Sequence, residues 1–208
     1  MLDYLRNPEE ITRRSFAIVR EEAVLAGLPE DVARLALRLI HACGMPEIVE
    51  GLAWGGNPGE TAAEALRAGA PILVDARMVE VGITRARLPA DNGIIVTLED
   101  ASVPRRAQAA GTTRSAAAVD LWEPFLEGAV VAIGNAPTAL FRLLELLEGG
   151  AGRPAAIFGF PVGFVGAAES KEALIESELG LPYLTLRGRR GGSALAAAAV
   201  NAAAKAEP

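Results

Sequence analysis

The feature that most constrains the fold is an alternation of short apolar runs and helical stretches that begins at residue 71. Each apolar run is continuous, which is typical of strands that are buried on both faces. The order of strands and helices is typical of a parallel sheet with crossover helices. The apolar runs span residues 71–75, 94–98, 129–133, 155–158 and 183–186, and the helical stretches span 114–126, 137–147, 167–179 and 193–205. The sequence therefore predicts an α/β fold with a mainly parallel open sheet and helices on both faces.

Two helices are predicted before the sheet. The first spans residues 8–26 after Asn7, which can cap it, and the second spans residues 29–43. A glycine-rich segment follows, in which we predict no regular element, and then a short helix over residues 60–67. Because the chain shows no internal repeat and no linker, we expect a single domain over residues 1–208.

The charge balance argues against nucleic acid as a partner. The formal net charge is −6 and only 5% of the residues are aromatic, so the chain lacks both a basic surface and stacking residues. Of the 20 basic residues only Lys171 and Lys205 are lysine, and the rest are arginine. Arginine binds carboxylates and phosphates through paired hydrogen bonds. A GC-rich genome would produce the same bias, which therefore identifies no ligand by itself.

Cysteine and histidine each occur once, as Cys43 and His41. An intrachain disulfide and a zinc site built from several such ligands are therefore excluded. The N-terminus has neither the charged start nor the apolar block of a signal peptide. No uninterrupted apolar run reaches the roughly 18 residues of a membrane span. We expect a cytoplasmic protein without a membrane segment.

The loops that follow the predicted strands form a candidate binding site. Ligands of open parallel sheets bind beyond the carboxyl ends of the strands. Those ends lead into residues 75–77, 134–138, 159–163 and 187–192, several of which are rich in glycine, and two of which carry arginine. Glycine lets a ligand approach the backbone, and helix N-termini favour anions. Together the loops predict a site for a polyanionic ligand.

Several familiar catalytic motifs are absent. The chain has no glycine fingerprint for a dinucleotide, no phosphate-binding loop of the nucleotide hydrolases, and no Gly-x-Ser-x-Gly turn. Asp75 and Asp100 offer carboxylates for a metal or for acid–base chemistry, but no cluster of carboxylates stands out in the sequence.

His41 is the clearest candidate for proton transfer. It lies in the last predicted turn of its helix, where the partial negative charge of the helix end favours the protonated imidazolium. Such a histidine can act as a general acid. Cys43 lies two residues further on and does not share a helix face with His41. We interpret Cys43 as a small buried apolar residue, with a nucleophilic thiol as the alternative.

Seven short segments, in their order along the chain, carry a family resemblance. They read LIHACG (39–44), APILVD (70–75), GITRARLP (82–89), TRSAAA (113–118), VAIGNAPTAL (131–140), PVGFVGAAESK (161–171) and RGRRGGS (187–193). In this order and spacing they resemble the precorrin-8X methylmutases of vitamin B12 biosynthesis, a family that includes the cobalt-precorrin-8 methylmutases. The resemblance covers the chain from Tyr4 to about Asn201.

The resemblance implies an isomerase that moves a methyl group from C11 to C12 of the corrin precursor ring, formally a 1,5-sigmatropic shift. The substrate would be precorrin-8X, giving hydrogenobyrinic acid, or cobalt-precorrin-8, giving cobyrinic acid. Either is a flat macrocycle fringed with carboxylates, which agrees with loops that carry arginine. The resemblance implies no cofactor and no metal held by the protein. It also implies a homodimer with active sites near the subunit interface.

The resemblance further implies roles for individual residues. His41 matches the catalytic histidine, which would protonate the ring-C nitrogen or stabilise the charge that develops there. Ser15 and Arg38 match positions that hold the substrate, and a spacing of three places Arg38 and His41 on one helix face. Further candidates for contacts with the carboxylates or the rim of the macrocycle are Arg14, Thr84, Arg85, Arg114 and Arg187.

Two other hypotheses stay open at the level of the sequence. A non-catalytic corrinoid-binding carrier would keep the pocket without turnover. An unrelated α/β hydrolase or transferase would use Cys43 or His41. Within the family, the sequence motifs do not distinguish a metal-free substrate from one that holds cobalt.

Overall fold

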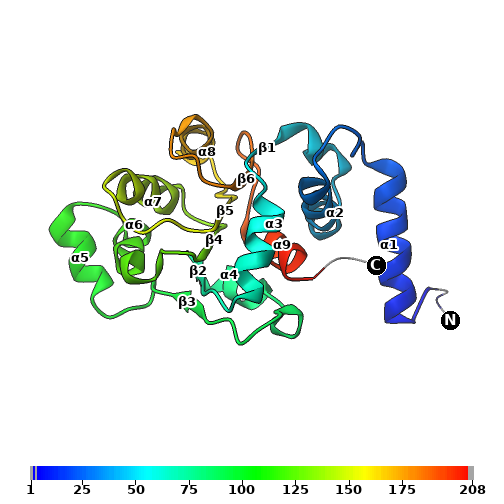
Figure 1. The fold of residues 1–208 in the computed structure, drawn as a ribbon, viewed down its shortest axis with the longest axis horizontal. Helices are drawn as coiled ribbons and strands as arrows, with labels where there is room; N and C mark the ends of the chain where they lie inside the picture. The colour runs from blue at the N-terminus through cyan, green and yellow to red at the C-terminus, as the bar shows by residue number, and fades with distance from the viewer. Residues whose placement is uncertain (1, 3, 206–208) are drawn as a thin grey trace.

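The structure, a computed structural model, describes Leu2 and residues 4–205. Within this part of the chain six strands form one sheet in the order β1-β6-β5-β4-β2-β3 (Figure 1). β1 pairs antiparallel with β6, and all other neighbouring pairs are parallel. The strands are β1 (Leu52–Gly55), β2 (Ile72–Val74), β3 (Ile94–Val96), β4 (Val130–Ile133), β5 (Ala156–Gly159) and β6 (Tyr183–Leu186). The predicted α/β fold with a mainly parallel sheet is confirmed.

Helices lie on both sides of the sheet, with α2, α3 and α9 on one side and α6 and α7 on the other (Figure 1). The α-helices are α1 (Pro8–Glu22), α2 (Glu30–Cys43), α3 (Pro58–Arg67), α4 (Arg77–Gly82), α5 (Val103–Ala110), α6 (Arg114–Val119), α7 (Pro137–Glu148), α8 (Ala167–Glu176) and α9 (Ser193–Ala204). The 3-10 helices are η1 (Pro46–Gly51), η2 (Arg85–Arg87) and η3 (Asp120–Phe125). No helix in the described range is long and apolar enough to cross a membrane.

Both faces of the central strands are covered by apolar side chains. In β2, Ile72 and Val74 belong to the core that contains α2, α3 and α9, whereas Leu73 belongs to the core that contains α7. In β4, Val130 lies in the first core and Val131 in the second. All five side chains are fully buried. This two-sided burial explains why the strands appear in the sequence as continuous apolar runs.

The glycine-rich segment contains the edge strand β1, contrary to the prediction. Leu52 of this strand lies opposite Leu186, and Gly55 lies opposite Tyr183. A Cβ atom at Gly55 would lie 2.5 Å from Cε1 of Tyr183, so glycine is what lets the tyrosine ring lie against the strand. Because glycine weakens a strand signal and the strand is short, the sequence pattern did not predict β1.

Helix boundaries also differ from the prediction. α1 ends at Glu22 rather than at residue 26, and α8 ends at Glu176 rather than at residue 179. The predicted helix over 114–126 divides into α6 and η3, because Pro124 has no N–H to donate. The short helices α4 and α5 were not predicted, since neither is long enough to show a helical period clearly.

The alanine-rich helix α9 lies in the centre of the molecule. It packs against α2, α3 and α4 and against the strands β4 and β5. The packing is close: a Cβ atom at Gly82 would lie 2.7 Å from Cβ of Ala197, and one at Gly134 would lie 2.9 Å from Cβ of Ala196. The small side chains of α9 therefore let three helices and the sheet pack closely against it.

A buried asparagine on α9 joins this helix to the end of α4. Asn201 is 4% exposed, its Nδ2 donates to the carbonyl of Gly82 at 2.9 Å, and its Oδ1 accepts from the N–H of Thr84 at 2.8 Å. We expect Asn201→Ala to lower the free energy of unfolding by about 2–3 kcal/mol, because it leaves backbone groups without partners. Urea unfolding measures the change. Asn57→Ala is the control, since Asn57 is exposed and its side chain forms no hydrogen bond that caps α3. Equal effects of the two substitutions would contradict the stabilising role of Asn201.

Candidate active site

His41 lies exposed in the last turn of α2. Gly44 ends this helix in the left-handed conformation, with φ of 69°, and its N–H donates to the carbonyl of Ile40. A left-handed residue at this position is favourable for glycine, which has no Cβ. The carbonyl groups of the last turn give the helix end a partial negative charge, and His41 lies in that turn.

Two neighbouring residues of α1 fix the ring of His41. Ser15 Oγ lies 2.8 Å from His41 Nδ1, and the ring of Phe16 stacks on the imidazole with centroids 4.7 Å apart and planes 15° from parallel. Phe16 and Val19 are buried and hold α1 in place. The imidazole is therefore held at one edge by a hydrogen bond and on one face by an aromatic ring. The contact of Phe16 was not predicted from the sequence, although Phe16 directly follows Ser15.

Arg38 and Arg14 belong to the same region. Arg38 is half-buried and lies one turn before His41 on α2, and Arg14 is exposed on α1 beside Ser15. Ser15 and His41 are in direct contact, and Arg14 and Arg38 lie on the same two helices. The contact between α1 and α2 thus brings Ser15 to His41, whereas Arg14 and Arg38 are their neighbours along the helices.

A second cluster of basic residues follows β6. We call residues 187–192 the arginine loop; it contains Arg187, Arg189 and Arg190. The N–H of Arg187 donates to the carbonyl of Gly51 at 2.8 Å, and Arg190 forms an ion pair of 3.2 Å with Glu47 of η1. Since η1 directly follows the end of α2, the arginine loop lies on the side of the molecule where α2 ends.

A surface hollow of about 580 Å³ lies between the arginine loop and η1. Its three arginines face two glutamates, Glu47 and Glu50. Arg187 also pairs with Glu172 of α8, and the guanidinium of Arg189 lies 5.2 Å from the ring centre of Phe164, which is 84% exposed. The ion pairs are solvent-exposed, so exchanging a glutamate for a ligand carboxylate costs little free energy.

Three predicted site residues lie elsewhere. Thr84 binds Asn201 through its N–H, and Arg85 pairs with Glu80, so both belong to the contact of α4 with the second half of α9. Arg114 is exposed in the first turn of α6. These bonds tie Thr84 and Arg85 to α4 and α9 rather than to α1 or α2.

A buried carboxylate occupies the point where the order of the strands reverses, between β2 and β4. Asp75 follows β2 and accepts hydrogen bonds of 2.8–2.9 Å from the N–H groups of Gly134, Asn135 and Ala136 after β4. Burial raises the pKa of Asp75, and the three N–H donors oppose that rise. Such a crevice is where α/β folds often bind an anion. Here the carboxylate of Asp75 already accepts from these three N–H groups. The loop after β4 therefore binds Asp75 and has a structural role instead of holding a ligand anion.

Cys43 is poorly suited to act as a nucleophile. Burial raises the pKa of its thiol, the charge of Glu47 raises it further, and the charge of Arg190 lowers it. A raised pKa keeps the sulfur protonated, and the thiol is much less reactive than the thiolate. This disfavours the hypothesis of a hydrolase or transferase that uses Cys43. No group of three or more histidine, cysteine or acidic side chains in the described range is arranged to hold a metal ion.

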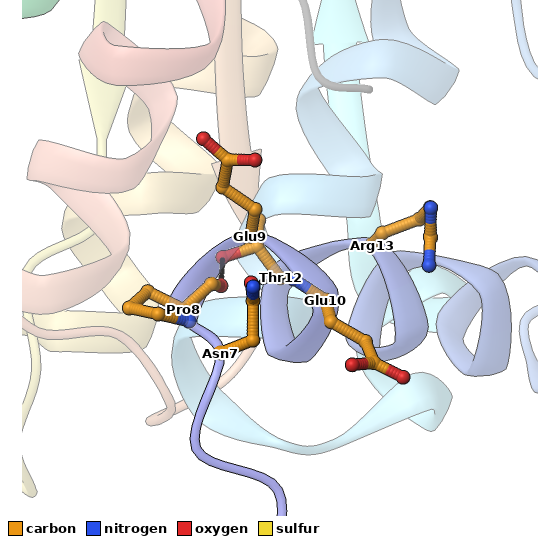
Figure 2. A pocket seen from close by; sticks show the side chains of 6 residues that line it. All are labelled: Asn7, Pro8, Glu9, Glu10, Thr12 and Arg13. Carbon is orange, nitrogen blue, oxygen red and sulfur yellow. Dashed lines mark hydrogen bonds between the residues drawn. The ribbon is translucent and has the colours of Figure 1, made fainter.

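A further hollow, of about 630 Å³, lies along the first turns of α1 (Figure 2). It is lined by Asn7, Pro8, Glu9, Glu10, Thr12 and Arg13. The side chains of Glu9, Glu10 and Arg13 point in different directions (Figure 2). Two carboxylates beside one arginine disfavour a polyanionic ligand, and none of the predicted site residues lines this hollow.

Comparisons with known proteins agree with the resemblance in the sequence. The family model for precorrin-8X methylmutase matches residues 10–206. A precorrin-8X methylmutase of Pseudomonas aeruginosa is 59% identical over 98% of both chains, and one of a Sinorhizobium species is 56% identical over 98% of this chain and 97% of its own. A solved structure of the precorrin-8X methylmutase from Thermus thermophilus superposes with a TM-score of 0.86 at 39% identity, covering 94% of both chains. The chain therefore belongs to the precorrin-8X methylmutase family, isomerases of cobalamin biosynthesis.

Proposed function

We propose that this chain converts precorrin-8X into hydrogenobyrinic acid by moving the C11 methyl group to C12, with His41 as the general acid. The observation that carries the assignment of His41 is its double contact with α1, through Ser15 at Nδ1 and Phe16 on the ring face. A ring that is held in this way, at a helix end that favours its charge, is prepared to donate a proton.

The proton is donated from Nε2, because Ser15 binds the ring at Nδ1. In the protonated ring Nδ1–H donates to Ser15 Oγ, and Nε2–H donates to the ring-C nitrogen of the substrate as the methyl group migrates. Because substrate and product are isomers, the proton returns to His41 within the turnover, and the step needs no oxidant or other reactant.

The arginines bind the carboxylates at the rim of the macrocycle. Arg38 is the candidate nearest to His41, and Arg187 belongs to the arginine loop. For Arg14, Thr84, Arg85 and Arg114 the proposed contacts rest on the family resemblance alone, since Thr84 and Arg85 lie at the contact of α4 with α9 and Arg114 lies on α6. Neighbouring glutamates do not oppose binding at Arg187, because its ion pair is exposed and exchangeable.

The proposed substrate is the metal-free precorrin-8X, because the Pseudomonas aeruginosa and Sinorhizobium relatives, at 59% and 56% identity, carry that name. The test is anaerobic incubation of the purified protein with precorrin-8X and, separately, with cobalt-precorrin-8, followed by absorption spectra. We expect faster conversion of the metal-free substrate to the orange hydrogenobyrinic acid. Faster conversion of the cobalt substrate would overturn the choice of substrate, and binding of both without conversion would instead support a carrier.

Removal of the Ser15 hydroxyl tests how the ring is held. We expect Ser15→Ala to lower kcat by about 10- to 150-fold, because one hydrogen bond to a charged group contributes about 1.5–3 kcal/mol. Steady-state kinetics with precorrin-8X measures the change. Thr12→Ala is the matched control on α1, since among the described residues the Thr12 hydroxyl donates within its own helix, to the carbonyl of Pro8 at 2.9 Å. Equal kcat values for the two variants would contradict the role of Ser15.

The protein is further proposed to be a homodimer, as the family resemblance implies, and to act in the cytoplasm. Light scattering on the purified protein is expected to give twice the chain mass of 21.6 kDa. A mass of one chain at the concentrations used for the kinetic assays would overturn the dimer.

A further inference from the structure

Lys171 is a buried basic residue to which the proposed mechanism gives no role. It lies on α8 and is 0% exposed, and its Nζ donates to the carbonyl of Arg190 at 2.6 Å. It forms no ion pair with any residue in the described range, although the neighbouring Glu172 lies close enough to favour its charge. Burial lowers the pKa of Lys171 to about 8. Because burying an ammonium group without an ion pair is unfavourable, this position is costly for the fold.

The bond partner of Lys171 belongs to the arginine loop, whose backbone lies directly on the turn after β5. The N–H of Gly192 donates to the carbonyl of Phe160 at 2.8 Å, and the N–H of Gly163 donates to the carbonyl of Arg189 at 3.3 Å. A Cβ atom at Gly191 would lie 2.4 Å from the carbonyl oxygen of Phe160. Only glycine therefore fits at position 191 without displacing the loop.

The side chains of the arginine loop point to two other elements. Arg187 pairs with Glu172 on α8, and Arg190 pairs with Glu47 on η1. These exposed pairs can exchange partners, whereas the bond of Lys171 to the backbone is shielded from water. The anchor of the loop is therefore the buried ammonium and the glycine contact, and the exposed arginine side chains are left to adapt to a ligand.

We infer that Lys171 is a positioning residue that holds the arginine loop on the turn after β5 and so aims Arg187, Arg189 and Arg190 at the carboxylates of the substrate. This inference rests on the proposed function, in which the loop binds those carboxylates. Lys171 does not touch the substrate; it acts through the carbonyl of Arg190. Its loss therefore weakens substrate binding more than it slows the methyl shift.

The test compares two variants of the contacts that hold the arginine loop. Lys171→Met removes the bond to the carbonyl of Arg190, and Gly191→Ala places a Cβ atom against the carbonyl of Phe160. Lys205→Met is the control, because it changes the only other lysine, which is exposed at the end of α9. For both test variants we expect KM for precorrin-8X to rise about 10-fold with kcat within about twofold of wild type, since losing one bond to a charged group weakens binding by about that factor. A merely structural role would lower the active fraction and so the apparent kcat, with KM unchanged. Unchanged KM in the variants that fold would overturn the inference.

Limited trypsin digestion gives a second readout that needs no substrate. Cleavage after the three arginines of the loop should be faster in Lys171→Met and Gly191→Ala than in wild type and Lys205→Met, at matched circular dichroism. If Lys171→Met fails to fold, the test uses Gly191→Ala and Lys171→Arg instead. Because Lys171→Arg keeps the charge, trypsin should cleave its loop more slowly than that of Gly191→Ala. Unchanged cleavage rates would overturn the anchoring role. If wild type does not convert precorrin-8X at all, the proposed function fails, while the digestion still tests the anchor.

Discussion

Replacement of His41 by alanine is expected to lower kcat for methyl migration by about 10²- to 10⁴-fold, the range commonly attributed to a general acid. The ring lies exposed at the end of α2 and is held by Ser15 and Phe16. Its removal takes away the proton donor but little of the core, because His41 is exposed and Phe16 and Val19, the buried residues of α1, are unchanged. We therefore expect the variant to fold and to bind product almost as well as wild type.

Single-turnover kinetics with precorrin-8X measures this effect, and spectral titration with hydrogenobyrinic acid measures binding. His41→Gln is the matched variant: its amide can hydrogen-bond to Ser15 but cannot be protonated near neutral pH. If His41 acts as an acid, both variants lose activity to a similar extent. Activity of His41→Gln close to that of wild type would show that the side chain only positions the substrate.

Replacement of Asp75 by asparagine is expected to lower the free energy of unfolding by about 2–4 kcal/mol. The buried carboxylate accepts from three N–H groups, those of Gly134, Asn135 and Ala136. An asparagine amide has one oxygen, and its NH2 group would face N–H donors, so at least one buried donor loses its partner and another meets a like dipole. Since these donors join the end of β2 to that of β4, the loss should loosen the carboxyl edge of the sheet.

Guanidinium unfolding, followed by circular dichroism, measures the change in stability. Asp91→Asn serves as the control, because Asp91 is exposed; its effect should stay within about 0.5 kcal/mol. A stability of Asp75→Asn within that same margin of wild type would contradict the structural role and favour the metal or acid–base role that the sequence analysis considered for Asp75.

The strands were predictable because burial on both faces leaves a simple pattern. β2, β4 and β5 are continuous apolar runs, and two cores of the structure use alternate residues of each. β1 was missed because its pairing with β6 depends on Gly55 lying under Tyr183, a contact between distant parts of the chain. The alanine-rich helix α9 was predicted as a helix, but its central position was not, because a helix that is buried all round shows no amphipathic period.

The site was predictable only in part. The place of His41 at a helix end follows from Gly44, which stops α2. Its contact with Ser15 joins residues 26 positions apart, and no local pattern encodes such a pair. The expectation that ligands bind beyond the carboxyl ends of parallel strands correctly placed the arginine loop at that edge of the sheet. The same expectation included Asp75, whose carboxylate instead accepts hydrogen bonds from the backbone. Which of the arginines bind carboxylates stays a prediction.

The most direct test of methyl migration and of the role of His41 follows the migrating methyl group itself. Precorrin-8X carrying a ¹³C label in the C11 methyl group is incubated anaerobically with wild type and with His41→Ala, and the position of the label is read by ¹³C NMR. We expect the label to move to C12 with wild type and to stay at C11 with His41→Ala over the same time. A label that stays at C11 with wild type would contradict the methylmutase activity, and equal migration with both proteins would contradict the role of His41.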